Sequence, residues 1–251
     1  MVGKTIGTMR VGERLIFGQY GVTNEVHPRI AWLKASPNCD FISEKVLDII
    51  QFDQREARNP SRCEEFYYGS TDYPLSNINL FLNSENADWW TALRQYSEPP
   101  LPHQKDHFGF LYWFDDYELN TLVDKSAVRL PASNEIIGGG RFPLFSRKGV
   151  RTNAAELNMC AMFGYGERSY IEFWCMTGNG RSKVNIIDRM GYANSMYPCQ
   201  NSGLRPVCRL NQDASVAIRD DGAFELVPFA VKQVQVFSDD DILNLLGLAH
   251  P

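Results

Sequence analysis

The chain has 251 residues, of which 44% are hydrophobic, 12% aromatic and 22% charged. This ordinary globular composition excludes a wholly disordered chain. The formal net charge is −5 and the basic residues do not cluster, which argues against nucleic acid and anionic membranes as main partners. No apolar run reaches the roughly 18 residues of a membrane span, and Met1 to Arg14 lack the apolar segment of a signal peptide.

Two strands are expected first along the chain. Glu13 to Tyr20 and Arg29 to Ala35 are rich in apolar and aromatic residues, and a connection with Gly, Asn and Pro joins them. The apolar stretch Ile42 to Ile50 follows, and its period leaves strand and helix equally open.

Three helices are expected next. Asp72 as a cap, with Pro74 in the first turn, predicts the start of the first helix. The segment from Ala87 to Tyr96 predicts a short second helix. Asp115 and Glu118 have the spacing of a capping box, which predicts a third helix from that point.

The last third predicts antiparallel strands, because apolar segments alternate there with turn residues. The expected strands are Tyr170 to Met176, Lys183 to Ile187, Leu204 to Leu210, Val216 to Ile218, Phe224 to Leu226 and Val231 to Phe237. Helices mainly in the N-terminal half and antiparallel strands in the C-terminal half make the predicted fold class α+β. We expect residues 1–237 to form one domain and residues 238–251 to form a short C-terminal helix or tail.

Residues that carry chemistry are few and scattered. The six cysteines contain no Cys-x-x-Cys motif, so we expect free thiols. His103 and His107 have the i, i+4 spacing of metal ligands, but a solvated loop explains them as well. Asp115, Asp116 and Glu118 could hold calcium or could serve as helix caps. Since nucleophile and phosphate-loop motifs are absent, we predict no catalytic residue, no metal site and no cofactor.

Short strings in a fixed order over about residues 10–212 carry a family likeness. The strings are Phe17-Gly-Gln-Tyr20, Ile30-Ala-Trp32, Tyr73-Pro-Leu-Ser-Asn-Ile78, Phe81-Leu-Asn-Ser84, Gly109-Phe-Leu111, Val128-Arg-Leu-Pro131, Phe173-Trp174 and Gly203-Leu-Arg-Pro-Val207. Together they resemble an uncharacterised C-type-lectin-like domain family of prophages and gut bacteria. That family is distantly similar to the formylglycine-generating (sulfatase-modifying) enzymes and to the variable domains of phage receptor-binding proteins. The resemblance implies a C-type-lectin-like fold, in which we expect Trp32 and Trp174 to anchor the core.

The resemblance and the absent catalytic motifs lead to one main functional hypothesis. We expect a non-enzymatic bacteriophage virion surface protein, either a tail or receptor-binding component or a capsid decoration, made in the host cytoplasm. Its expected partners are other virion proteins and a host-surface glycan or protein, without nucleic acid or membrane insertion, and we expect it to be oligomeric in the particle. The alternative is a formylglycine-generating-type oxidase or another enzyme on the same fold. The resemblance implies that such an oxidase uses a close cysteine pair, and the nearest pair here is Cys199 and Cys208.

The loops between the late strands are the candidate binding surface, because the variable loops of C-type-lectin-like folds lie there. These loops run from Thr177 to Arg181 and from Asp188 to Ser202. Tyr, Asn and Gly in such loops give adaptable contacts at a low entropy cost, although a plain ordered loop explains them equally. The candidate ligand-binding residues are Asn179, Arg181, Arg189, Tyr192, Asn194 and Tyr197.

Overall fold

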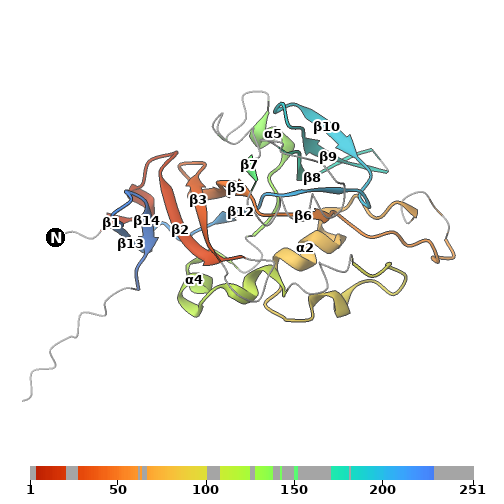
Figure 1. Cartoon of the computed structure of the whole chain (residues 1–251), viewed down its shortest axis with the longest axis horizontal. Coiled ribbons are helices and arrows are strands. Elements are labelled where there is room, and N and C mark those ends of the chain that lie inside the picture. The colour runs from red at the N-terminus through yellow and green to blue at the C-terminus, as the bar shows by residue number, and fades with distance from the viewer. Residues whose placement is uncertain are drawn as a thin grey trace, which may run out of the picture.

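A computed structural model describes residues 4–20, 28–61, 63, 67–100, 108–124, 128–137, 142, 150–151, 171–180 and 182–228. Within these ranges the chain forms a seven-stranded sheet, a five-stranded sheet and a two-stranded pair (Figure 1). The expected strand from Val231 to Phe237 and the C-terminal helix or tail of residues 238–251 lie outside the described residues.

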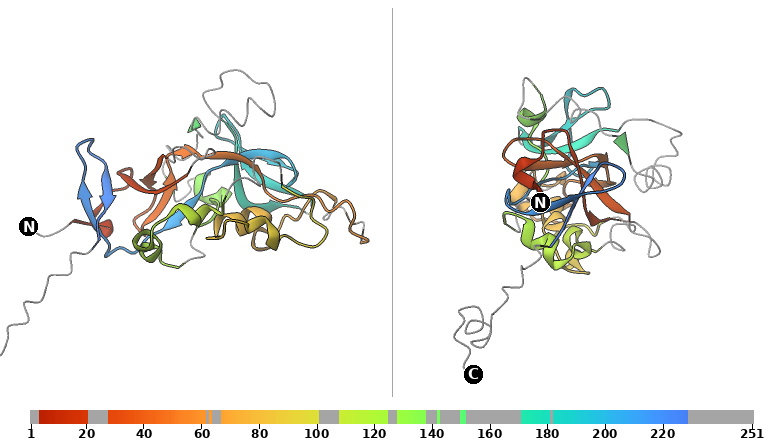
Figure 2. Two further views of the ribbon diagram at one scale, coloured as in Figure 1. Left: turned by 60° about the horizontal axis from the view of Figure 1, so that its bottom comes forward. Right: turned by 90° about the vertical axis from the view of Figure 1, so that its left-hand side faces the viewer.

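The seven-stranded sheet combines strands from both ends of the chain. Its order is β1 (Lys4–Thr5), β13 (Ser215–Ile218), β14 (Phe224–Leu226), β2 (Arg14–Gln19), β3 (Arg29–Lys34), β4 (Asp40–Ser43) and β12 (Val207–Arg209). Neighbouring strands are antiparallel except β14 and β2, which pair in parallel. The β13–β14 hairpin stands at the end of the molecule away from the five-stranded sheet (Figure 2).

The five-stranded sheet also joins distant segments. Its order is β10 (Ala193–Met196), β9 (Lys183–Ile187), β8 (Phe173–Asn179), β11 (Asn201–Leu204) and β6 (Asp48–Gln51). Only β11 and β8 are parallel. A short strand between β4 and β6, β5 (Lys45–Val46), pairs in parallel with β7 (Val150–Arg151). The chain therefore passes from one large sheet to the other within a few residues of β5.

Several strands are covered on both faces. Phe173 and Trp174 are neighbours on β8 and both are fully buried, yet they belong to two different apolar clusters. Phe41 and Ile42 on β4 divide between the same two clusters. Because successive side chains of a strand point to opposite faces, these strands have an apolar layer on each side.

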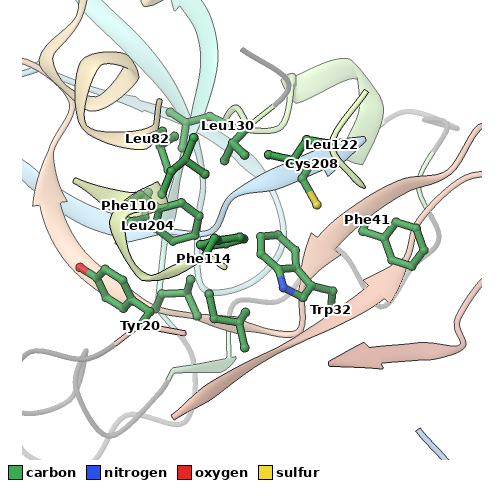
Figure 3. Packing of buried hydrophobic residues seen from close by; sticks show 14 of the residues in the cluster. Tyr20, Trp32, Phe41, Leu82, Phe110, Phe114, Leu122, Leu130, Leu204 and Cys208 are labelled. Carbon is green, nitrogen blue, oxygen red and sulfur yellow. The ribbon is translucent and has the colours of Figure 1, made fainter. Parts of the chain in front are cut away.

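The two tryptophans of the family-like strings anchor the larger cluster, which confirms their expected place in the core. Trp32 is fully buried, stacks on Phe17 with ring centroids 5.0 Å apart, and donates its indole N–H to the Phe17 carbonyl over 3.1 Å. Trp174 is fully buried and donates to the Ile50 carbonyl over 2.8 Å. Figure 3 shows Trp32 among Phe41, Phe114 and other members of this cluster.

Helical segments of the described part are short. The α-helices are α2 (Asn77–Leu82), α4 (Asp116–Thr121) and α5 (Ser133–Ile136). The 3-10 helices are η1 (Ile6–Thr8), η2 (Tyr73–Leu75), η3 (Trp89–Ala92) and η4 (Phe110–Trp113). No described helix is long and apolar enough to cross a membrane.

Two of the three predicted helix starts need correction. Asp72 forms no capping hydrogen bond, and the hydroxyl of Ser76 instead accepts the N–H of Asn79 at the start of α2. The segment from Ala87 to Tyr96 forms only the 3-10 turn η3. The third start is confirmed, because Asp115 and Glu118 form the reciprocal capping box of α4.

The predicted α+β class, with helices mainly in the N-terminal half of a C-type-lectin-like fold, is wrong, because the described part is mostly β. Six strands, β1 to β6, precede the first described α-helix, and four of them enter the seven-stranded sheet. The open stretch Ile42 to Ile50 forms strands, since its backbone groups pair with β3, β12, β7 and β11. Local periodicity misses this outcome because all but the β3 partner lie far away in the sequence.

Candidate functional site

The six candidate ligand-binding residues divide between the two ends of the β9–β10 ladder. Asn179 is exposed at the end of β8, beside the start of β9. Tyr197 follows β10 directly, and Met196 pairs with Val184, so Tyr197 lies at this same end. Arg181 lies outside the described residues.

Arg189 and Tyr192 lie in the β9–β10 turn at the other end of the ladder. The turn is held by Asp188, whose carboxylate accepts the N–H groups of Met190 over 2.8 Å and Tyr192 over 3.0 Å. Tyr192 is 68% exposed and Met190 is 69% exposed. About 10 Å separates Val184 from Ile187 at a strand rise of about 3.3 Å per residue, so this turn is a separate surface from Tyr197.

Asn194 lies on β10, an edge strand of the described five-stranded sheet. Its side-chain oxygen accepts the N–H of Ser195 over 2.8 Å. The side-chain oxygen of Gln200 accepts the N–H of Tyr197 over 3.0 Å in the same way. Both side chains occupy backbone donors that an incoming strand would use, so they protect this edge from strand addition.

Tyr197 belongs to a tyrosine cluster that the linear sequence does not reveal. Its ring stacks on Tyr68 with centroids 4.2 Å apart and planes inclined by 24°. Tyr67 meets Tyr68 edge to face at 4.9 Å and is 50% exposed. We define the tyrosine cluster as Tyr67, Tyr68 and Tyr197.

A cation lies at each end of the tyrosine cluster. The Lys183 ammonium is 5.3 Å from the Tyr197 ring centroid, and the Arg55 guanidinium carbon is 6.0 Å from the Tyr67 ring centroid. Arg55 donates its Nε–H to the Cys199 sulfur over 3.3 Å, and this hydrogen bond raises the pKa of Arg55. A positive charge therefore lies over Tyr197 and another over Tyr67, the first and last rings in the series of ring contacts Tyr197, Tyr68 and Tyr67.

The turn that carries Tyr197 is fixed by backbone hydrogen bonds. The Cys199 N–H donates to the Tyr68 carbonyl over 3.0 Å, and the Gln51 side chain donates to the Cys199 carbonyl over 2.7 Å. The Pro198 carbonyl accepts from the N–H groups of both Phe52 and Asp53. These hydrogen bonds consequently hold the segments of Tyr197 and Tyr68 together within the fold.

The segment that carries Tyr67 and Tyr68 is anchored by the buried carboxylate of Asp53. Asp53 is fully buried and accepts the N–H of Ser70 over 2.6 Å, the N–H of Asn77 over 3.1 Å and the Arg94 guanidinium over 2.5 Å. Arg94 also pairs with the buried Glu56. Burial raises the pKa of Asp53, while Arg94 and the two backbone N–H groups lower it.

Gly69 lets the chain turn between the tyrosine pair and Ser70. Its φ is +90°, a conformation that side chains rarely adopt, and an added Cβ would lie 3.0 Å from the Gln54 carbonyl oxygen. The close approach brings the tyrosine-bearing segment against the backbone of residues 53–54. The buried anchor and the exposed cluster thus form one local unit.

The described cysteines, Cys39, Cys63, Cys175, Cys199 and Cys208, are all free, and Cys160 lies outside the described residues. Burial raises the pKa of both Cys175 and Cys208 well above the ordinary thiol value. Both thiols are fully buried on strands and behave as small apolar side chains, as their sequence context predicts. Cys199 differs, because its sulfur accepts a hydrogen bond from Arg55.

The acidic cluster at the third helix serves the fold. Asp115 caps α4. Glu118 is 2% exposed and accepts from the Gly18 N–H over 2.9 Å, while Arg29 forms an ion pair with it at 2.7 Å. These contacts give both carboxylates a structural role. His103 and His107 lie outside the described residues.

Of the residues of this candidate surface, the sequence prediction includes Tyr197 but not Arg55, Tyr67, Tyr68 or Lys183. The sequence contains one indication of this surface. Tyr67 and Tyr68 are adjacent, follow a polar stretch with Pro60 and are not part of a periodic apolar pattern, which is typical of exposed tyrosines. The association of that pair with Tyr197 had no local signal, because about 130 residues of chain separate them. Comparisons of the chain with protein-family models, with curated proteins and with solved structures find no match.

Proposed function

We propose that the protein is a non-enzymatic surface component of a bacteriophage particle, in a tail, receptor-binding or capsid-decoration role, that binds a glycan or protein partner. The virion assignment is supported by the family-like strings of the sequence. The binding assignment is carried by the tyrosine cluster, in which Tyr68 and Tyr197 stack at 4.2 Å at the surface between two cations.

This arrangement has the properties of a preformed contact surface. Tyrosine offers a large amphipathic area with few rotatable bonds, so ordering it on binding costs little entropy. The backbone hydrogen bonds of the Tyr197 turn reduce the entropy cost of binding further, because they already fix the turn in the free protein. Because the rings come from two segments distant in the chain, a partner that contacts all of them would bind the folded protein and not the unfolded chain.

Two measurements test the proposal. Immunogold labelling of purified particles is expected to place the protein on the particle exterior, and its absence from particles would contradict the virion assignment. For binding, the Tyr68→Ala/Tyr197→Ala double variant is expected to lower attachment of the protein to host cells at least tenfold, with an unchanged circular-dichroism spectrum.

Matched tyrosine variants locate the binding surface. Tyr112→Ala removes a 43% exposed tyrosine from η4, outside the cluster, and is expected to leave attachment unchanged. Tyr192→Ala tests the turn at the opposite end of the β9–β10 ladder. If Tyr192→Ala abolishes attachment while the double variant does not, the binding surface is that turn and the tyrosine cluster is structural.

A further inference from the structure

The two cations beside the tyrosine cluster form no ion pair within the described part of the chain. Six other arginines there form ion pairs with carboxylates: Arg14, Arg29, Arg94, Arg129, Arg209 and Arg219. Arg55 and Lys183 form no ion pair with any described carboxylate, and among the described residues the Arg55 side chain donates to the Cys199 sulfur alone. Glu98 is a charged neighbour of Arg55 without forming an ion pair with it.

The positive charges of Arg55 and Lys183 favour an anionic ligand at the tyrosine cluster. The chain as a whole carries a formal net charge of −5, so its mean field repels anions. Two cations that form no ion pair with a described carboxylate attract a negative group locally, within about 8–10 Å at physiological ionic strength. Arg55 and Lys183 meet this condition, one over the Tyr67 ring and the other over the Tyr197 ring.

The tyrosines between the cations indicate the chemistry of the uncharged part of the ligand. A pyranose ring has an apolar C–H face and a rim of hydroxyl groups, which matches the apolar body and polar tip of tyrosine. An acidic saccharide chain repeats such rings and carries carboxylates on them. Carboxylates on two rings of one chain, with sugar surface between them, match two cations with tyrosines between them, in the order of contacts Lys183, Tyr197, Tyr68, Tyr67 and Arg55.

We infer that the tyrosine cluster with Arg55 and Lys183 binds an anionic saccharide, with sugar rings on the tyrosines and carboxylates at the two cations. This inference rests on the proposed binding function and names the ligand class of the same site. Arg55 offers a planar fork to a carboxylate, and Lys183 offers a point charge.

The test uses the purified full chain and acidic oligosaccharides of three backbones: hyaluronan, alginate and polysialic acid. Titration calorimetry is expected to detect binding of at least one of these oligosaccharides, and its affinity is expected to fall as the salt concentration rises. Chemical reduction of the carboxylates of that oligosaccharide to alcohols keeps the sugar backbone and is expected to weaken binding at least tenfold. Equal affinity for the reduced chain would overturn the inference in favour of a neutral glycan.

Variants assign the effect to this surface. Lys183→Gln and Arg55→Gln are each expected to weaken binding about five- to tenfold, while Lys45→Gln, at an exposed lysine on β5, is expected to have no effect. Tyr67→Ala tests the aromatic contribution to binding. We expect it to weaken binding of the carboxyl-reduced saccharide and of the unreduced saccharide by the same factor.

The remaining outcomes separate this inference from the proposed function. Binding of poly-glutamate but of none of the three saccharides would overturn the saccharide class in favour of an acidic peptide. If no anionic probe binds while Tyr68→Ala/Tyr197→Ala still abolishes cell attachment, the binding function stands and the anionic-saccharide inference is wrong. If the double variant also has no effect, both are wrong.

Discussion

Replacing Arg94 tests whether the buried anchor beneath the tyrosine cluster works as an ion pair. Arg94→Met keeps most of the side-chain volume but removes the guanidinium from Asp53 and Glu56. Removing one partner of a buried ion pair typically costs about 3–5 kcal/mol, because the remaining charge has no counter-ion. Since Arg94 is itself 29% exposed, we expect about 3 kcal/mol of lost unfolding free energy at pH 7.5.

The pH dependence of this loss follows from the pKa of Asp53. Burial already raises that pKa, and Arg94 opposes the rise, so the variant's folded-state pKa is higher still. A folded pKa above the unfolded value favours folding at low pH, and this contribution is lost as pH rises through the folded pKa. The variant should therefore approach wild-type stability on acidification, by about 1.4 kcal/mol for each unit by which its Asp53 pKa exceeds that of wild type.

Urea denaturation of both proteins at pH 4.5 and pH 7.5 measures the effect. Arg58→Met is the control, because Arg58 is exposed and forms no ion pair with a described carboxylate. Adding Asp53→Asn to Arg94→Met should recover part of the loss at pH 7.5, because the unpaired carboxylate is then gone. A loss below about 1 kcal/mol, or one independent of pH, would refute the ion-pair reasoning.

Three further substitutions test the fold. Trp174→Ala should lower the unfolding free energy by about 3–5 kcal/mol, measured by urea denaturation, and wild-type stability would show that this side chain is not a core anchor. Gly203→Ala should destabilise the fold by about 1–3 kcal/mol or more, because the new Cβ would lie 2.6 Å from the Glu172 carbonyl oxygen; an unchanged melting temperature would contradict the close packing of β11 on β8. Asn194→Ala should free the Ser195 N–H at the sheet edge and increase self-association in analytical ultracentrifugation, whereas a sedimentation profile identical to wild type at every concentration would remove the edge-protection role.

The amino-acid sequence by itself determined the elements whose partners are local. The capping box of Asp115 and Glu118 starts α4 as predicted, and the predicted strands Val216 to Ile218 and Phe224 to Leu226 pair as the antiparallel strands β13 and β14. The strands β2 and β3 also match their predicted segments, because both the alternation and the neighbouring partner lie within about 20 residues. In each case the hydrogen bonds and side-chain contacts that stabilise the element join residues close in the chain.

Only the tertiary structure decided the fold class and the composition of the candidate site. The stretch Ile42 to Ile50 is strand because β12, β11 and β7 supply its hydrogen bonds from more than 100 residues away. Tyr67 and Tyr68 join Tyr197 for the same kind of reason, since Asp53 and the Cys199 N–H fix both segments. The local sequence pattern indicates which face of an element is buried. Which segment lies next to that element in a sheet or at the surface depends on the packing of the whole chain.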